Sequence, residues 1–439
     1  MLSKGFGILE VVITTFVIGV VAVGVFSLIT LTLKSSHDGQ RRIIATALAN
    51  ETMEKIRNLP YDNVGTVGGV PSGPIVQSQQ VTRNGSEYTI ATDIRYIDDP
   101  YDGTAEGNPP DALNTDYKQA RVEVSWQSNV SARPVLLITQ ITPKGIEGGS
   151  SLGTLVFQAL NAAGAGVAGA TVHLSNSEVS PLVDLTTATN DEGRVVIPGL
   201  LAASGTYQLT VSKAGHTTEQ TYTPAGVFTP DTDHSHLTAI AGQVINKTFS
   251  LDAVASLVVQ TVDALTSAPI PDVAYRITGT KKIGTDENAQ PVYVLDANDT
   301  TDSSGSHEYQ SMVWDSYAIS IDGTVTGYDI EDTSLPLPLV INPGAEETVL
   351  MKLAAHTPLS LHVTVLPSSQ EPIENASVHV TKSGYDETKQ TTVNGQAFFA
   401  DMPENSEYTI TVDAAGYQQS VQQVTVDGTV RTQVTLVAL

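Results

Sequence analysis

The feature that most constrains this chain is an uninterrupted apolar segment near its N-terminus. Residues 11–33 are 23 consecutive residues without a charged side chain. As an α-helix this segment would be about 34 Å long, enough to cross a hydrocarbon core of roughly 30 Å. In lipid, a single segment satisfies its own backbone hydrogen bonds only as a helix. We therefore predict a membrane-spanning helix over residues 11–33.

The residues before this helix predict its orientation. The short cationic start, with Lys4, keeps the N-terminus in the cytoplasm and sends the rest of the chain across the membrane. A secretory signal peptide would instead have a shorter apolar region, followed by a cleavage site of small residues. We therefore expect a single-pass protein of the cytoplasmic membrane with its N-terminus inside.

Charge separates the first 59 residues from the rest of the chain. Residues 1–59 hold six basic and four acidic residues, whereas the other 380 hold 16 basic and 43 acidic ones. The strongly acidic remainder argues against sequence-independent binding of nucleic acid, which needs a cationic surface. The chain also has no cysteine. A disulfide framework and any cysteine-ligated zinc are therefore excluded.

One carboxylate, Glu10, lies at the edge of the apolar segment. A charge at this depth is costly and indicates a function that involves a partner. If the chain were cut after Gly5, Phe6 would become the N-terminus and Glu10 the fifth residue. The new amine and the carboxylate could then pair between adjacent subunits. The alternative is a plain membrane anchor that tolerates Glu10 at the lipid interface.

The sequence Lys4-Gly5-Phe6, followed by three residues and Glu10 and then by the apolar helix, resembles the class III leader of type IV prepilins and pseudopilins. The resemblance implies that residues 1–5 are a leader. It implies that a prepilin peptidase cleaves after Gly5 and N-methylates Phe6, and that Glu10 guides the docking of subunits. The chain has Gly-Ile after Phe6 where the family usually has Thr-Leu, a change that leaves these residues intact.

The helix is predicted to continue beyond the membrane until Pro60 ends it. Its second half keeps apolar residues at helical spacing, in a stripe that we expect to pack on a sheet. The members of this stripe are Ile43, Ile44, Ala47, Leu48, Met53, Ile56 and Leu59. The family resemblance implies the same form: a helix over residues 6–59 with a protruding apolar half and an amphipathic half.

Residues 60–144 are predicted to form a pilin-like head with a β-sheet. The alternation of polar and apolar residues indicates strands at residues 74–82, 88–96, 119–126 and 134–141. Asn84-Gly85 predicts a two-residue hairpin turn between the first two.

An acidic loop rich in glycine and proline occupies residues 98–116 of this head. Asp98, Asp99, Asp102, Asp111 and Asp116 could supply the oxygen ligands that Ca²⁺ prefers, and the first three are the main candidates. The spacing matches no EF-hand loop, so the alternative is a solvated surface loop. Ca²⁺ is the one cofactor that this loop suggests.

After a linker at residues 145–151, the chain repeats itself three times. The motifs Leu155-Val-Phe-Gln, Leu257-Val-Val-Gln and Leu361-His-Val-Thr start units 102 and 104 residues apart. Each unit continues with a turn into a strand, a glycine turn and a strand that begins with tyrosine. Many short alternating strands in about 100 residues predict a β-sandwich. The predicted units are residues 152–253, 254–355 and 356–439.

These units resemble carboxypeptidase regulatory-like sandwiches of the transthyretin type, with the first and third units closer to the pattern than the second. The related collagen-adhesin repeats often carry a lysine on the first strand, which forms an isopeptide bond with asparagine. The first strands here, at residues 155–160, 257–262 and 361–366, hold no lysine. We therefore expect no such crosslink in its usual place.

A second group of metal-ligating residue types lies in a long loop of the first repeat. Two aspartates and two histidines within six residues could bind Zn²⁺ or another divalent ion. They are Asp231, Asp233, His234 and His236. The other two repeats lack the group, and the alternative is again a solvated loop.

The sequence as a whole predicts a mainly β protein with one long N-terminal helix, a pilin-like α+β head and three tandem β-sandwiches. No nucleophile, base and orienting group occur together in a plausible context, so we expect no enzyme. The predicted function is that of a type IV pilin-like subunit, minor or tip-located, with the sandwiches displayed at the cell surface or in an extracellular filament for adhesion or spacing. Its expected partners are the prepilin peptidase, other pilin subunits, the inner membrane and a surface carbohydrate or protein ligand.

Two alternatives remain open. One is a pseudopilin of a type II secretion or DNA-uptake system, which would use the same N-terminal features in another machine. The other is a membrane-anchored surface binding protein that never polymerises. The role of Glu10 separates this second alternative from a filament subunit, because a plain anchor should tolerate its loss.

Overall fold

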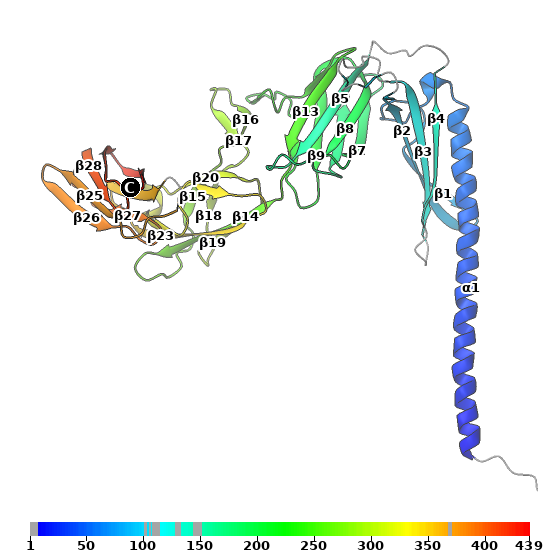
Figure 1. The fold of residues 1–439 in the computed structure, drawn as a ribbon, viewed down its shortest axis with the longest axis horizontal. Coiled ribbons are helices and arrows are strands. Elements are labelled where there is room, and N and C mark those ends of the chain that lie inside the picture. Colours follow the sequence, from blue (N-terminus) through cyan, green and yellow to red (C-terminus); the bar gives the residue numbers. More distant parts are fainter. Residues whose placement is uncertain are drawn as a thin grey trace, which may run out of the picture.

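The fold is mainly β, with one long N-terminal helix from which a row of β-sandwiches extends sideways (Figure 1). The computed structural model describes residues 8–100, 103–104, 107, 115–127, 133–143, 152–367 and 371–439, with the backbone only for residues 8–11. The predicted leader, residues 1–5, and the predicted linker, residues 145–151, lie outside the described residues.

Helix α1 (Ile8–Arg57) is 50 residues long and continuous. Asn58 and Leu59 follow it, and Pro60, which has no N–H to donate, precedes a 3₁₀ turn (Tyr61–Asn63). The head sheet has the order β1-β2-β3-β4, with antiparallel neighbours. Its strands are β1 (Ser78–Arg83), β2 (Ser86–Ile97), β3 (Tyr117–Trp126) and β4 (Val135–Ile141).

The hairpin between β1 and β2 has the geometry predicted for it. Asn84 and Gly85 both have positive φ, 49° and 70°, as a two-residue turn that matches the strand twist requires. The four strands coincide with the predicted segments to within a few residues.

The packed face of α1 contains most of the predicted stripe: Leu48, Met53 and Ile56 are buried, and Ile44 and Leu59 pack beside them, whereas Ile43 and Ala47 face away. Ala45 and Ala49 are fully buried on the sheet, together with Leu48, whereas Ile43 is 72% exposed. Ala47 is also exposed. Two residues turn about 200° around a helix, so Ile43 and Ala47 lie on the face opposite Ala45. The small side chains of Ala45 and Ala49 let the helix approach the sheet closely. For this steric reason the alanines face the sheet, and the larger Ile43 does not.

A buried lysine ties the start of the head to its sheet. Lys118 on β3 is 1% exposed and donates hydrogen bonds to the carbonyl oxygens of Tyr61 and Val64, both at 2.8 Å. Its ammonium also lies 4.6 Å from the ring centre of Tyr61. Burial lowers the pKa of Lys118 to about 8. Sequence patterns gave no sign of this contact, because lysine in an alternating strand normally faces water.

Three sandwiches follow the head, each with two packed sheets. The first contains β5 (Leu152–Leu160), β6 (Thr171–Asn176), β7 (Val183–Ala188), β8 (Arg194–Leu201), β9 (Ala203–Ser212), β10 (Glu219–Gln220), β11 (Thr229–Pro230), β12 (Leu237–Ala239) and β13 (Val244–Ser250). The second contains β14 (Ala255–Asp263), β15 (Ala274–Thr278), β16 (Lys282–Thr285), β17 (Pro291–Tyr293), β18 (Asp296–Thr300), β19 (Ser306–Met312), β20 (Asp315–Ser320), helix α2 (Gly323–Thr326), β21 (Tyr328–Thr333), β22 (Leu339–Ile341) and β23 (Glu346–Ala355). The third contains β24 (Ser360–Pro367), β25 (Ser377–Lys382), β26 (Tyr385–Gln390), β27 (Gln396–Phe399), β28 (Ser406–Asp413), β29 (Ser420–Val426) and β30 (Thr429–Leu436).

The three predicted repeats share a core strand pairing, to which the second adds β21 beside β23. In each, the first strand pairs in parallel with the last: β5 with β13, β14 with β23, and β24 with β30. The predicted glycine turns all have positive φ, at Gly193, Gly305 and Gly395. The repeated sequence motifs thus correspond to repeated backbone geometry.

The tyrosine of each repeat has a structural role. Tyr207, Tyr317 and Tyr408 are buried, and each hydroxyl donates to a backbone carbonyl four to six residues upstream. The three O–O distances are 2.8, 2.6 and 2.8 Å. This hydrogen bond gives the buried tyrosine hydroxyl an acceptor and holds the loop before the strand in place.

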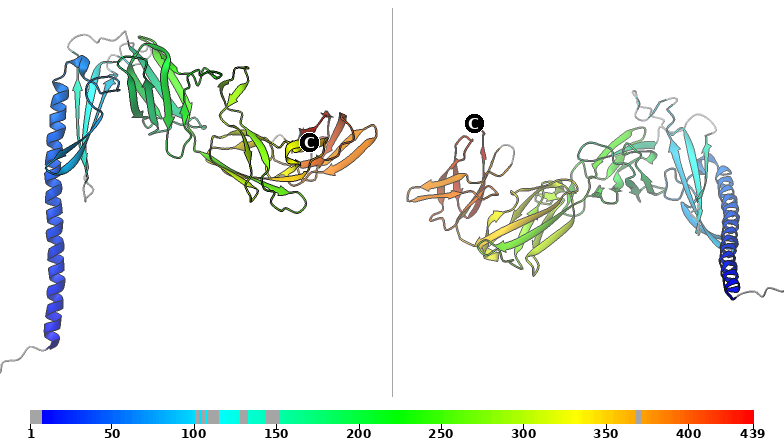
Figure 2. Two further views of the ribbon diagram at one scale, coloured as in Figure 1. Left: turned by 180° about the vertical axis from the view of Figure 1, so that it is seen from behind. Right: turned by 60° about the horizontal axis from the view of Figure 1, so that its bottom comes forward.

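The head and the sandwiches form an arm whose C-terminal end lies far from α1 in all views (Figures 1 and 2). At the junction of the head and the first sandwich, the ring of Tyr96 packs on Gly199. Between the first and second sandwiches, β11 pairs with β16 in a sheet that both sandwiches build. Both of these junctions therefore have specific contacts.

Candidate functional site

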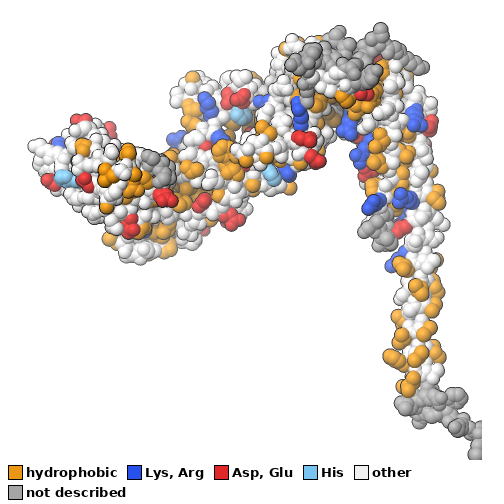
Figure 3. All heavy atoms as spheres, viewed as in Figure 1, with side chains coloured by type: hydrophobic (Ala, Val, Ile, Leu, Met, Phe, Trp, Pro, Cys, Tyr) orange, Lys and Arg blue, Asp and Glu red, His pale blue; other side chains and the backbone are white. Residues whose placement is uncertain are grey.

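The most unusual surface of the molecule is the N-terminal half of α1. Its side chains from residue 12 to residue 29 are exposed, including Phe16 and Phe26 at about 70%. In Figure 3, hydrophobic side chains cover this part of the helix, which projects from the head without any other element beside it. A soluble protein rarely leaves so large a continuous apolar surface uncovered, so this surface needs an apolar partner.

Three hydroxyl side chains in this half of α1 form hydrogen bonds with the backbone of their own helix. The hydroxyls of Ser27, Thr30 and Thr32 donate to carbonyl oxygens three or four residues earlier in the same helix, at 2.8–2.9 Å. No water is needed for these groups, as a lipid or helix-bundle environment demands. Length and composition make this the one helix of the described chain that could cross a membrane.

The predicted processing residues lie before this surface. Gly5 and Phe6 are outside the described residues, and Glu10 lies within α1, where the description covers its backbone only. Cleavage, methylation and docking at these residues remain predictions from the sequence.

The helix becomes part of the head where charged residues begin. Arg41 lies 3.7 Å from Asp38 and donates to the carbonyl oxygen of Gln127 at 3.1 Å. The packed half follows directly, with Ala45, Ala49 and Ile56 fully buried. One continuous helix thus has an uncovered apolar half and a half that belongs to a folded domain.

The acidic loop of the head is described in part. The backbone N–H of Asp99 donates to the carboxylate of Asp116, so these two residues lie together, with Asp98 beside them in the chain. Asp102 and Asp111 are outside the described residues. The predicted calcium ligands therefore stay a prediction.

The aspartate and histidine loop of the first sandwich is held by hydrogen bonds, and metal binding by its residues stays a prediction. His234 donates its backbone N–H to Asp231 at 2.9 Å, and its Nδ1 lies 2.7 Å from the same carboxylate oxygen. Burial raises the pKa of Asp231, but these hydrogen bonds outweigh burial and lower it. The carbonyl oxygen of Asp233 accepts a hydrogen bond from Lys247. Burial lowers the pKa of His236.

These contacts build a turn that supports the junction of two sandwiches. The turn follows β11, which pairs with β16 of the second sandwich, and the N–H of Asp231 donates to the carbonyl oxygen of Ile283 at 3.1 Å. Within the described part of the chain, no three His, Asp or Glu side chains are grouped to hold a metal ion. The loop has a docking role that its residue types did not indicate.

A tryptophan completes the same junction. Trp314 of the second sandwich donates from Nε1 to Asp252 of the first at 2.6 Å. The ammonium of Lys281 lies 3.4 Å from the centre of its ring system. The contact joins residues 62 positions apart, so local sequence patterns do not indicate it.

One protein-family model matches two of the three sandwiches. Residues 158–252 and 360–437 match the carboxypeptidase regulatory-like domain. The matches cover the first and third sandwiches, the two repeats that resemble this family most closely in sequence. A comparison with curated proteins gives no match.

Solved structures give distant likenesses. The Bacillus anthracis TIE protein is 14% identical, with 83% of this chain and 73% of that chain covered and a TM-score of 0.19. BcpA, the major pilin subunit of Bacillus cereus, is 12% identical, with 66% and 100% covered and a TM-score of 0.16. The shaft pilin SpaA from Lactobacillus rhamnosus GG is 10% identical, with 66% and 98% covered and a TM-score of 0.15. TM-scores this low do not establish a shared overall architecture and carry no functional inference.

Proposed function

We propose that the protein is a type IV pilin-like structural subunit without enzymatic activity. The observation that carries the proposal is the form of α1: an uncovered apolar half that continues into a half packed on a four-stranded antiparallel sheet. The predicted motif of Gly5, Phe6 and Glu10 supports it from the sequence. Other pilin subunits would cover the apolar half in a filament, and the inner membrane would cover it before assembly.

The arm suggests where in a filament the subunit works. Three sandwiches project sideways from the helix, and such a volume would crowd a filament in which every subunit carried it (Figure 2). We therefore propose a minor or tip-located subunit that presents the sandwiches for adhesion or spacing. Immunogold labelling of sheared filaments tests this: labels at the ends or at sparse positions are expected, and dense labelling along the shaft would contradict it.

The assembly role is tested at Glu10. In the producing organism, Glu10→Ala should lower the amount of the protein in sheared filaments at least tenfold while its amount in membranes stays normal. Glu51→Ala is the matched control, because Glu51 lies on the same helix, is exposed, and pairs with two residues of the packed part of the molecule, Lys55 at 2.8 Å and Arg83 at 4.0 Å. Equal incorporation of Glu10→Ala and the wild type would favour a plain membrane anchor.

A further inference from the structure

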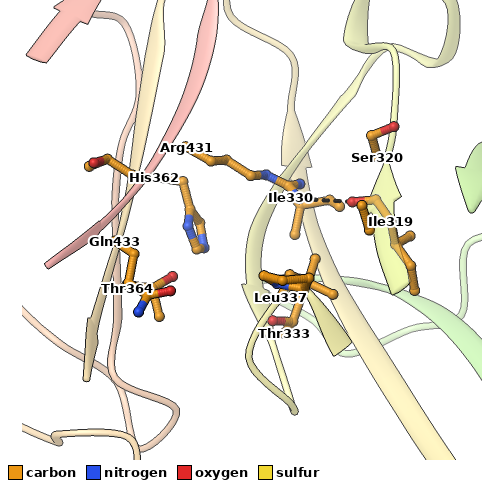
Figure 4. Close-up of a pocket in the computed structure, with 12 residues that line it drawn as sticks. Ile319, Ser320, Ile330, Thr333, Leu337, His362, Thr364, Arg431 and Gln433 are labelled. Atoms are coloured by element: carbon orange, nitrogen blue, oxygen red, sulfur yellow. Dashed lines mark hydrogen bonds between the residues drawn. The ribbon is translucent and has the colours of Figure 1, made fainter. Parts of the chain in front are cut away.

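A pocket of about 420 Å³ lies between the second and third sandwiches. The second sandwich contributes an aliphatic wall with Ile319, Ile330 and Leu337, and the third contributes a polar wall with His362 and Arg431. Figure 4 shows the two walls facing each other, with Arg431 extended between them. The volume falls within the range of small-molecule sites in proteins.

The polar wall is a property of the third sandwich alone. In the parallel pairing of first and last strands, His362 on β24 lies opposite Arg431 on β30. The equivalent position follows the leucine that starts each repeat. The corresponding pairs in the first and second sandwiches are Val156 with Asn246 and Val258 with Thr348. The shared fold therefore does not require an imidazole and a guanidinium at this place.

The imidazole of His362 is neutral and held in one orientation. The side-chain oxygen of Gln396 accepts a hydrogen bond from the N–H of Thr333 at 2.8 Å, and Nε2 of His362 lies 3.0 Å from the same oxygen. Nε2 must therefore carry the proton in this contact. Burial, reinforced by the charge of Arg431, lowers the pKa of His362 to about 4. At neutral pH the imidazole adds no charge to the pocket.

The charge of the pocket comes from Arg431. Among the described residues that line the pocket, it is the one charged side chain, and the carboxylate of Asp329 is near enough to act on it. One N–H donates to the carbonyl oxygen of Ile319 at 3.0 Å, across the junction. A guanidinium has five N–H groups, so donors remain, and part of the side chain stays exposed to a ligand. Burial of the rest lowers the pKa of Arg431 to about 10, although the charge of Asp329 raises it, so the guanidinium is still charged at neutral pH. This is a cationic site in a protein of net charge −25.

We propose that this pocket binds a small monocarboxylate with an apolar body. The guanidinium of Arg431 would pair with the carboxylate, since its planar fork matches two carboxylate oxygens. The apolar body would lie against Ile330 and Leu337. A single cation beside a neutral imidazole matches one negative charge better than the two charges of a phosphate dianion. Because such a ligand contacts both walls, it would also hold the second and third sandwiches together.

The probe for the test is hexanoate, with hexan-1-ol and inorganic phosphate as comparisons. Ligand-observed NMR titrations use the full chain in lipid nanodiscs, with empty nanodiscs as the reference for partitioning into lipid. Hexanoate should bind at least tenfold more tightly than either comparison compound. Arg431→Met should weaken hexanoate at least tenfold. Arg276→Met, at an exposed arginine that pairs with Asp296 elsewhere on the second sandwich, should leave it unchanged.

A second variant keeps the test valid if Arg431→Met unfolds the junction. Leu337→Trp fills the pocket from the opposite wall and leaves the guanidinium intact, so it should also weaken hexanoate at least tenfold. Equal binding of hexanoate and hexan-1-ol would overturn the proposal, because the charge would then contribute nothing. Equal binding of phosphate would overturn the role of the apolar wall. Absence of hexanoate binding, or full binding to both variants, would overturn the site itself.

Discussion

The N-terminal half of α1 exposes its apolar side chains, whereas the three-sandwich arm buries them. Along the helix, Phe16, Val23 and Phe26 are about 70% exposed and have no partner in the described chain. In the arm, Leu155, Val259 and Val363 are fully buried, each in the core of its own sandwich. Each sandwich of the arm therefore buries its own apolar core, whereas the apolar half of α1 needs a partner outside the described chain to cover it.

The packed half of α1 shows that the exposure of apolar side chains depends on what surrounds the helix and not on the helix itself. Ala45, Ala49 and Ile56 belong to the same continuous helix and are fully buried by the head sheet. Substitutions in the two halves should therefore act on different properties: the packed half on folding, the uncovered half on insertion and assembly.

The largest expected effect comes from a charge placed in each half. Ala49→Asp buries an unpaired carboxylate and should lower the free energy of unfolding of the head by at least about 4 kcal/mol. Val21→Asp should leave that free energy unchanged in detergent, yet disfavour membrane insertion by about 3 kcal/mol. Urea unfolding and alkaline extraction of membranes measure the two effects. A lower free energy of unfolding of the head in Val21→Asp would contradict the separation of the two halves.

The second effect is a pH dependence of the arm at His362. Its pKa is about 4 in the folded chain and 6.5 in the unfolded chain, so folding favours the neutral imidazole. The resulting stability is complete above pH 6.5 and is lost as the pH falls towards 4. A shift of this size corresponds to about 3 kcal/mol.

The control for this dependence is His362→Gln, which keeps a donor for Gln396 but does not titrate. Urea unfolding at pH 7 and pH 4.5 should show a larger loss in the wild type than in the variant. Carboxylates elsewhere contribute equally to both proteins, so they cancel in the difference. Equal losses in the two proteins would show that His362 titrates normally in the folded chain.

A third effect concerns the junction between the head and the arm. A β-carbon at Gly199, where φ is +90°, would lie 2.4 Å from the ring of Tyr96. Gly199→Ala should therefore destabilise this junction by about 2 kcal/mol through overpacking, beyond any backbone strain. Gly205→Ala is the control, because φ is +63° and the β-carbon would meet open space. Faster limited proteolysis at the junction in Gly199→Ala alone is the expected outcome.

The smallest effect concerns one buried hydrogen bond within the third sandwich. Tyr408→Phe removes the hydrogen bond to the carbonyl oxygen of Glu404 and should cost about 1 kcal/mol of unfolding free energy. Tyr417→Phe, at a partly exposed tyrosine, should change it little. Thermal unfolding of both variants checks the difference. An equal effect of the two substitutions would remove the special role of the repeated tyrosine.

Local sequence patterns predicted much of this fold because the features concerned are local. The end of α1 before Pro60, the hairpin at Asn84-Gly85 and the strands of the head follow from backbone chemistry and alternation. The repeats followed from internal similarity, and the parallel pairing of their first and last strands gives that similarity a physical basis.

The parts that were missed depend on contacts between distant residues. The predicted stripe on α1 included Ile43 and Ala47, which face away, and missed the buried Ala45 and Ala49, because the size of a side chain says nothing of how closely the sheet approaches. The loop of Asp231 and His234 follows a strand that pairs with the next sandwich, a contact that its residue types did not indicate. The pocket at His362 and Arg431 forms only where two sandwiches meet.

The central claim is that α1 is completed by other subunits after processing, and mass spectrometry of the N-terminus tests it most directly. Protein would be recovered separately from sheared surface filaments and from membranes. The account predicts chains that begin at N-methylated Phe6 in the filament fraction. Processed chains found only in membranes would favour a pseudopilin. Chains with an intact Met1, confined to membranes, would contradict the account and leave α1 as a plain anchor.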